Sequence, residues 1–100
     1  MKIYISGKIS GLDEETYTTI FKQGAYQLNC EGWRYEDIIN PLHINPLFGI
    51  KKWFFFMVSD LIALYRCDAI YMLYNWKNSK GARIELLFAL LWNKKIYFQD

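Results

Sequence analysis

The stretch Asp68-Ala-Ile-Tyr-Met-Leu-Tyr74 decides the fold, and it carries one charged residue, at its start. Both sets of alternate residues in it are apolar, so a strand formed here has two apolar faces. A strand of this kind is typical of a parallel sheet that helices cover on both sides. We therefore expect residues 68–74 to form a central strand of such a sheet.

The segments on either side alternate between strand and helix patterns. The predicted strands are residues 2–6, 37–40, 68–74 and 95–98. The predicted helices run from the N-cap Asp13 to Gly32, over residues 51–65 and over residues 81–92. Alternating strands and helices specify a parallel sheet with right-handed crossovers. We expect one domain over residues 1–100, an α/β three-layer fold of the flavodoxin or Rossmann type, with a four-stranded parallel sheet in the order 2-1-3-4.

The two later helices have different apolar patterns. Residues 51–65 are apolar on nearly every side, which predicts a largely buried helix. In residues 81–92 the residues Ile84, Leu87, Phe88 and Leu91 lie on one apolar stripe of the predicted helix.

Composition excludes several classes of protein. Hydrophobic residues make up 53% of the chain and aromatic residues 19%, which predicts a packed core rather than a disordered tail. The net charge of +2 is far from that of a dedicated nucleic-acid binder, so we expect no nucleic-acid polymer as partner. Cys30, Cys67 and the single histidine, His43, do not form a zinc-ligand or redox pattern, and we expect reduced thiols, no metal and no cofactor.

Membrane and export signals are weak in this sequence. The most apolar stretch, residues 53–59, is far shorter than the roughly 20 residues that a membrane span needs. The first residues read directly into a strand and lack the layout of a signal peptide. We therefore expect a cytoplasmic protein without a membrane partner.

Two loops are candidates for a binding site. In an open parallel sheet, ligands bind beyond the carboxyl ends of the strands where the strand order reverses, here after the first and third strands. The loops 7–12 and 75–80 leave these strands and lead into helix N-termini, which favour anions. Lys8, Ser79 and Lys80 add donors, although a glycine-containing turn of this kind can also be plain geometry.

Three acidic residues could lie near that place. Composition alone favours a solvent-exposed carboxylate for Glu85 over one that points into the cleft. Asp60 lies within an apolar helix, where a carboxylate must be paired, cap a helix or have a function. Asp68 precedes a buried strand, and a structural turn or cap is the better interpretation there. His43 is the one possible base for a triad-like site, which we regard as a minor alternative.

Several spaced residues resemble the signature of one family: Tyr4-x-x-Gly7, Asp60, Asp68 and Ser79-x-Gly81-x-x-x-Glu85. The chain resembles the nucleoside 2-deoxyribosyltransferase superfamily, especially its 2'-deoxynucleoside 5'-phosphate N-hydrolases and short uncharacterised bacterial and phage relatives. The resemblance covers nearly the whole chain in order. It implies cleavage or transfer of the N-glycosidic bond of a deoxynucleoside or its 5'-monophosphate, and therefore a small nucleoside or nucleotide as partner.

The resemblance also implies roles for individual residues. Glu85 would be the nucleophile at the anomeric carbon, Asp60 would contact the sugar or base and assist proton transfer, and Tyr4 would hold Glu85. A carboxylate suits this role because it stabilises an oxocarbenium-like transition state. The implied substrate and phosphate contacts are Gly7, Lys8, Ser10, Ser79 and Gly81, with Lys8 standing in for a family arginine that Ser10 replaces.

Two other functions stay open. The transferases carry a further acid where this chain has Asn78 or its neighbours, which leaves room for a nucleotide-binding module without catalysis. A structural or interaction protein with a relic pocket is the third possibility. We also expect a homodimer or higher homo-oligomer for two reasons. The predicted topology leaves an apolar patch on the first-helix side of strands 3 and 4, and residues 53–56 of the second helix add more apolar surface than a small sheet can hide.

Overall fold

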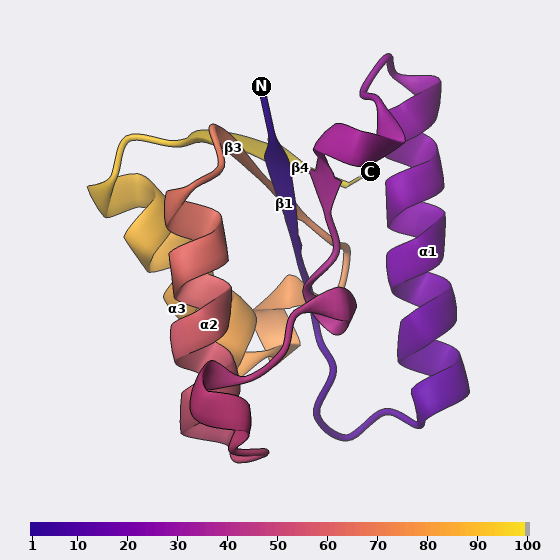
Figure 1. The fold of residues 1–100 in the computed structure, drawn as a ribbon. Helices are drawn as coiled ribbons and strands as arrows, with labels where there is room; N and C mark the ends of the chain where they lie inside the picture. Colours follow the sequence, from indigo (N-terminus) through magenta and orange to yellow (C-terminus); the bar gives the residue numbers. More distant parts are fainter. Residues whose placement is uncertain (100) are drawn as a thin grey trace.

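The computed structural model describes residues 1–99 and contains a four-stranded parallel sheet in the order β2-β1-β3-β4 (Figure 1). The strands are β1 (Ile3–Ser6), β2 (Ile38–Ile39), β3 (Ala69–Met72) and β4 (Lys95–Phe98). The helices are α1 (Glu14–Cys30), α2 (Trp53–Tyr65) and α3 (Lys80–Leu91), and short 3-10 turns η1 (Tyr35–Asp37), η2 (Pro41–His43), η3 (Leu47–Gly49) and η4 (Trp76–Asn78) connect them. The predicted fold class and strand order are confirmed.

The register of the central strands aligns their carboxyl ends. β1 pairs with β3 along its whole length, from Ile3 opposite Ala69 to Ser6 opposite Met72. The loops that follow both strands therefore start at the same edge of the sheet. This pairing places the two candidate binding loops next to each other.

Helices cover the sheet on both sides, with α1 on one face and α2 and α3 on the other (Figure 1). Because successive strand residues point to opposite faces, β3 divides its apolar residues between two cores. The core beside α1 includes Ile3, Ile5, Phe21, Leu28, Ala69, Tyr71 and Leu73. The core beside α2 and α3 includes Tyr4, Leu64, Cys67, Ile70, Met72, Ala82 and Ala89. The two apolar faces predicted for residues 68–74 are confirmed.

Leu73 fixes the approach of α1 and of the first loop to the sheet. A Cβ atom added to Gly7 would lie 2.6 Å from Leu73 Cδ1, and one added to Gly24 of α1 would lie 2.6 Å from Leu73 Cδ2. Neither glycine can therefore carry a side chain while Leu73 keeps its place. The close approach of α1 is built into the sequence at Gly24.

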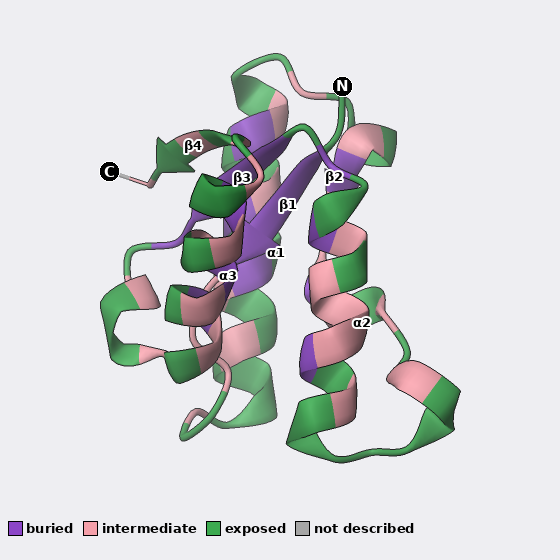
Figure 2. Cartoon of the chain, turned by 90° about the vertical axis from the view of Figure 1, so that its left-hand side faces the viewer, coloured by how far each residue is buried: buried purple, intermediate pink, exposed green. Residues whose placement is uncertain are grey.

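The predicted burial of α2 is wrong. Its buried residues are Met57 and Leu64, whereas Phe54 is 62% exposed. A helix that lies on a small sheet beside one other helix can bury one stripe, and the apolar residues outside this stripe remain at the surface (Figure 2).

The apolar stripe predicted for α3 meets the core only in part, since Phe88 packs against it. The residues that face the sheet are Ala82, Glu85 and Ala89, while Leu87 and Leu91 are exposed. The two alanines are small enough to bring the helix close to the sheet, and this orientation turns Glu85 inward. Leu86 and Phe88 pack against the edge of this core, whereas Leu87, Leu90 and Leu91 are exposed.

The bare patch predicted on the α1 side of strands 3 and 4 is covered at β3, whereas at β4 Tyr97 remains 42% exposed. At β3, Ala69, Tyr71 and Leu73 are buried, because Gly24 lets α1 approach this face closely. In β4 the ring of Tyr97 packs edge-on against Trp33 at a centroid distance of 6.2 Å. Within residues 1–99, no helix combines the length and the apolar character that crossing a bilayer requires.

Candidate functional site

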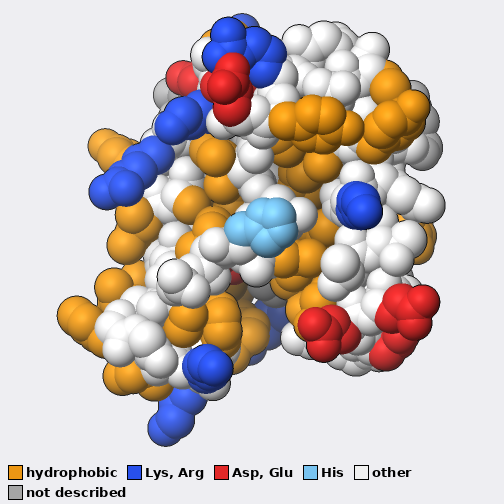
Figure 3. All heavy atoms as spheres, turned by 45° about the vertical axis from the view of Figure 1, so that its right-hand side comes forward, with side chains coloured by type: hydrophobic (Ala, Val, Ile, Leu, Met, Phe, Trp, Pro, Cys, Tyr) orange, Lys and Arg blue, Asp and Glu red, His pale blue; other side chains and the backbone are white. Residues whose placement is uncertain are grey.

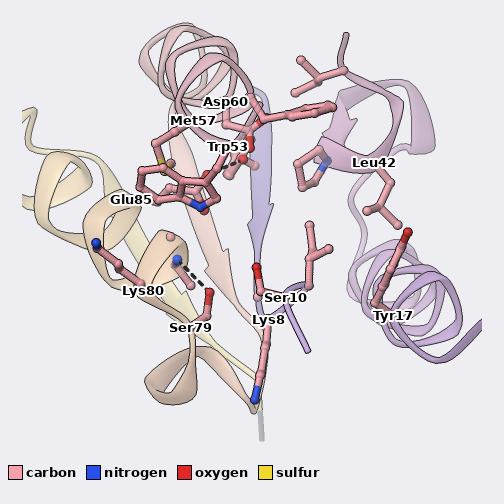
Figure 4. Close-up of a pocket in the computed structure, with 18 of the residues that line it drawn as sticks. Lys8, Ser10, Tyr17, Leu42, Trp53, Met57, Asp60, Ser79, Lys80 and Glu85 are labelled. Atoms are coloured by element: carbon pink, nitrogen blue, oxygen red, sulfur yellow. Dashed lines mark hydrogen bonds between the residues drawn. The ribbon is translucent and has the colours of Figure 1, made fainter. Parts of the chain in front are cut away.

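A cavity of about 380 Å³ lies at the carboxyl ends of β1 and β3 (Figure 4). Its walls come from β1 and the loop after it, from the η2 region, from α2 and from the start of α3. The predicted meeting of loops 7–12 and 75–80 is confirmed, since both contribute to this cavity. The backbone N–H of Lys8 also donates a hydrogen bond to Asn75 Oδ1 at 3.1 Å, which ties the two loops together.

Glu85 is held at the inner end of the cavity by two hydroxyl groups. The Tyr4 hydroxyl donates to Glu85 Oε2 at 2.5 Å, and the Ser6 hydroxyl donates to Oε1 at 2.6 Å. Glu85 is 5% exposed, so the composition-based expectation of a solvent-facing side chain is wrong. The carboxylate is fixed in one orientation because each oxygen has its own donor.

The electrostatics of this cluster follow from its burial. Burial raises the pKa of Glu85 to about 7, and the hydrogen bonds from Ser6 and Tyr4 oppose that rise. Burial and the nearby Glu85 carboxylate raise the pKa of Tyr4 well above its usual range, so its hydroxyl remains a donor. The cluster therefore holds a carboxyl group that titrates near neutral pH.

Asp60 provides a second carboxyl group to the same cavity, from α2 (Figure 4). Its Oδ1 atom is buried and has no hydrogen-bond partner among the described residues. Burial, followed by the charge of Glu85, raises the pKa of Asp60 to about 8. A buried polar atom without a partner is costly in a folded protein. Here the cavity itself is the place from which a partner can come.

The cationic and hydroxyl-bearing residues predicted from the sequence lie at the mouth of the cavity. Lys8, Ser10, Ser79 and Gly81 all line it. The Ser79 hydroxyl caps α3 by accepting a hydrogen bond from the Ala82 N–H at 3.1 Å (Figure 4). The mouth therefore combines a helix N-terminus with amine and hydroxyl donors, an arrangement that favours anions.

Three other sequence-based interpretations can be compared with the structure. Gly7 lines the cavity, but the contact with Leu73 already explains why it is a glycine. Asp68 accepts a hydrogen bond from the Lys2 N–H at 2.9 Å and so has the structural role that was expected. His43 is exposed and lies outside the cavity lining, as the pale blue side chain in Figure 3 shows.

Sequence reasoning missed Ser6 and the aromatic residues of the cavity. The signal for Ser6 was its position two residues after Tyr4 in a strand, which places both hydroxyls on one face. These aromatic residues are Trp53 and Phe56 of α2 on one side of the cavity and Tyr17 of α1 on the opposite side (Figure 4). Nothing in the sequence marked these aromatic residues as cavity residues rather than core residues. The Nζ atom of Lys80 lies 5.5 Å from the Trp53 ring centroid.

Different parts of the cavity therefore carry different chemical groups. Two carboxyl groups with raised pKa values lie inside, aromatic rings from α1 and α2 line opposite sides, and lysines lie at the mouth. Within residues 1–99, no group of three or more His, Cys, Asp and Glu side chains is arranged to hold a metal ion.

Comparison with curated proteins gives no match. A family model described as a domain of unknown function, DUF4406, matches residues 1–98. Because this model spans almost the entire sequence, the chain belongs to the DUF4406 family.

Proposed function

We propose that this protein cleaves or transfers the N-glycosidic bond of a deoxynucleoside or its 5'-monophosphate, with Glu85 as the nucleophile. The observation that carries the proposal is the pair of carboxyl groups that share one cavity. Glu85 is oriented by Tyr4 and Ser6, and Asp60 has a buried oxygen that lacks a partner. The resemblance to the nucleoside 2-deoxyribosyltransferase superfamily supports the same assignment.

The different surroundings of the two carboxyl groups suit two different roles. Glu85 receives two hydrogen bonds that favour its charged form, whereas no such bond reaches Asp60 Oδ1. These bonds favour the carboxylate form of Glu85, whereas burial and the charge of Glu85 raise the pKa of Asp60 and favour its protonated form. Pairs of titratable groups whose pKa values are pushed apart commonly serve as nucleophile or base and as acid.

The proposed reaction has two steps. In the first, a Glu85 carboxylate oxygen forms a bond to C1' of the sugar while the bond from C1' to the base nitrogen breaks. The electron pair of the broken bond goes to the base, and Asp60 supplies the proton that neutralises it. In the second step, water attacks C1' and releases the sugar from Glu85, giving its proton to Asp60. A second base in place of water would give transfer instead of hydrolysis.

The cavity walls fit the shape of such a substrate. A planar base can stack on the aromatic side chains of α2 that line the cavity, Trp53 and Phe56. An anionic 5' group can reach the start of α3 and the ammonium group of Lys8. The sugar then lies between these two subsites, beside Glu85.

The test is an assay for release of free base. The protein is incubated with each deoxynucleoside and each deoxynucleoside 5'-monophosphate, and products are separated by chromatography. We expect base release by the native protein and a loss of several orders of magnitude in Glu85→Gln. Glu15→Gln, an exposed change at the start of α1, is the matched control and is expected to keep full activity.

Two outcomes would contradict the proposal. Absence of base release from every substrate at high protein concentration would exclude it. If ligands nevertheless raise the melting temperature, the nucleotide-binding module without catalysis becomes the better description, for which Asn78 at the cavity is the supporting residue. Full activity in Glu85→Gln would place the chemistry on another residue.

A further inference from the structure

The two hydroxyl groups that hold Glu85 reach it from different places. Tyr4 and Glu85 both line the cavity, whereas Ser6 lies outside the cavity lining. The Ser6 side chain is completely buried, and its hydroxyl donates to Glu85 Oε1 at 2.6 Å. Ser6 therefore contacts Glu85 from the interior of the protein, at a position that a ligand in the cavity does not reach.

The backbone of Ser6 is fixed by its neighbours in the sheet. Ser6 is paired with Met72 of β3, and its carbonyl oxygen accepts a hydrogen bond from the Leu73 N–H at 2.8 Å. A single side-chain torsion separates the backbone of a serine from its hydroxyl oxygen, and this torsion has three staggered positions. The fixed strand therefore leaves the Ser6 hydroxyl few places to lie, and it is already in position before any ligand arrives.

The two donors differ in what could replace them. Without the Tyr4 hydroxyl, the space at Glu85 Oε2 would adjoin the cavity, from which a water molecule or a ligand group can donate. The space around the Ser6 hydroxyl adjoins no part of the cavity lining. Without Ser6, Glu85 Oε1 would be a buried acceptor that lacks a partner, and this condition is most costly when the carboxyl group is charged.

Other ionisable groups do not take over this task. Those in the core and cavity around Glu85 are Tyr4 of β1, Asp60 of α2, Cys67 before β3, and Lys8 and Lys80 at the mouth. Burial raises the pKa of each of the three acidic groups, which favours their neutral forms. Neither lysine forms an ion pair with Glu85 within residues 1–99. The hydroxyl bonds therefore oppose the burial-driven rise in the pKa of Glu85, and the bond from Ser6 does so more strongly than the bond from Tyr4.

We infer that Ser6 is a positioning residue for the proposed nucleophile, and that the charge and orientation of Glu85 depend more on Ser6 than on Tyr4. This inference rests on the proposed function for the role of Glu85, and it adds the group that prepares Glu85 for that role. The family resemblance assigns the holding of Glu85 to Tyr4 alone. Because Ser6 does not touch the substrate, its loss should lower kcat and leave KM nearly unchanged.

The first test measures the ionisation of Glu85 without any substrate. Carbon NMR of the chain with isotope-labelled glutamate follows each carboxyl group through a pH titration, and Glu85→Gln identifies the Glu85 resonance by its loss. We expect the acid dissociation constant of Glu85 to fall by about tenfold to a hundredfold in Ser6→Ala, because a hydrogen bond to a charged group is lost. Ser6→Thr keeps the hydroxyl and should retain the native value, and Tyr4→Phe should change this constant less than Ser6→Ala does.

The second test is the pH profile of base release. In Ser6→Ala the acidic limb of kcat/KM should move to higher pH, because Glu85 must lose its proton to act as a nucleophile. Ser6→Thr should restore the native profile. A purely structural role of Ser6 would lower the melting temperature and leave the acidic limb where it is.

Circular dichroism establishes that each variant is folded. Ser6→Cys, which has a similar shape but a weaker donor, takes the place of a variant that is not, and it should give a smaller change in the same direction. An unchanged titration of Glu85 in Ser6→Ala overturns the inference, and so does a larger change in Tyr4→Phe. If the native chain releases no base while the titration of Glu85 still depends on Ser6, the proposed function fails and the positioning of Glu85 by Ser6 stands.

Discussion

On the α1 side of the sheet, β1 contributes Ile3 and Ile5 to an apolar core, whereas on the α2 and α3 side it contributes Tyr4 and Ser6 to the hydroxyl cluster around Glu85. The four residues are consecutive and all are completely buried. The side-chain alternation of a strand separates them into two environments. One short strand therefore supplies both a packing face and a polar face.

The two faces differ in how burial affects stability. Burying apolar side chains against α1 stabilises the fold at every pH. Burying carboxyl groups on the other face opposes folding whenever they are charged, as the raised pKa values of Glu85 and Asp60 indicate. We therefore expect substitutions on the first face to lower stability, and substitutions of the carboxyl groups to change activity and pH dependence instead.

The largest expected effect on stability lies on the α1 side. Phe21→Ala removes a completely buried ring and should lower the free energy of unfolding by about 3 to 5 kcal/mol. Chemical denaturation measures this change. Tyr26→Ala, on the exposed side of the same helix, should alter stability by less than about 1 kcal/mol. Equal effects of the two substitutions would contradict the assignment of the core.

The second effect is a pH dependence that belongs to the polar face. Because the pKa of Glu85 is raised from 4.5 to about 7, the folded state keeps a proton that the unfolded state has lost between these values. The raised pKa of Glu85 therefore makes its full contribution to the free energy of unfolding below about pH 4.5. As the pH rises to about 7, this contribution falls by on the order of 3 kcal/mol.

Glu85→Gln removes this titration. Relative to the native chain, the variant should gain stability as pH rises, and its melting temperature above pH 7 should be the higher of the two. Thermal melts between pH 4 and pH 8 measure the difference. A difference that is constant with pH would mean that Glu85 does not have a raised pKa. Glu15→Gln is expected to show such a constant difference, since Glu15 is exposed.

The third effect separates proton transfer from structure at Asp60. Asp60→Asn preserves the shape of the side chain but cannot donate a proton as an acid, and we expect base release to slow by about a hundredfold. The melting temperature should not fall, because Asp60 Oδ1 has no hydrogen-bond partner to lose. Kinetic assays and thermal melts on the same preparation measure both quantities. A loss of stability with unchanged activity would assign Asp60 a structural role.

The smallest effect concerns the mouth of the cavity. Lys80→Gln removes an ammonium group from the cavity lining at the start of α3, and an exposed ion pair of the kind it would form with a 5'-phosphate is worth about 0.2 to 1 kcal/mol. We expect a few-fold increase in KM for deoxynucleoside 5'-monophosphates and little change for deoxynucleosides. Lys77→Gln is the matched control, because Lys77 lies 5.9 Å from the Trp76 ring but outside the cavity lining. A similar change in KM for both substrate types would exclude a role in binding the 5' group.

The sequence by itself determined the strands, the helices and their order, because these depend on local patterns that repeat every two or every three to four residues. The apolar run at residues 68–74 required a sheet covered on both sides, and the spacing of Glu85 from Ser79 and Gly81 placed it near the start of a helix that follows the central strand. The predicted ends of the strands and helices agree with the structure to within a few residues. Proline and glycine mark many of these ends, and they affect the backbone only at and next to their own positions.

The tertiary structure alone decided which face of each later helix is buried. Residues 53–65 and 81–91 are apolar in several directions, so periodicity could not choose between Leu87 and Ala89 as the residue that meets the sheet. That choice depends on how closely the helix approaches the strands, and the small residues Ala82 and Ala89 permit the closest approach. The same approach buries Glu85 against Tyr4 and Ser6, residues about 80 positions away in the chain. Contacts across such distances depend on the packing of the whole fold, and no local pattern records them.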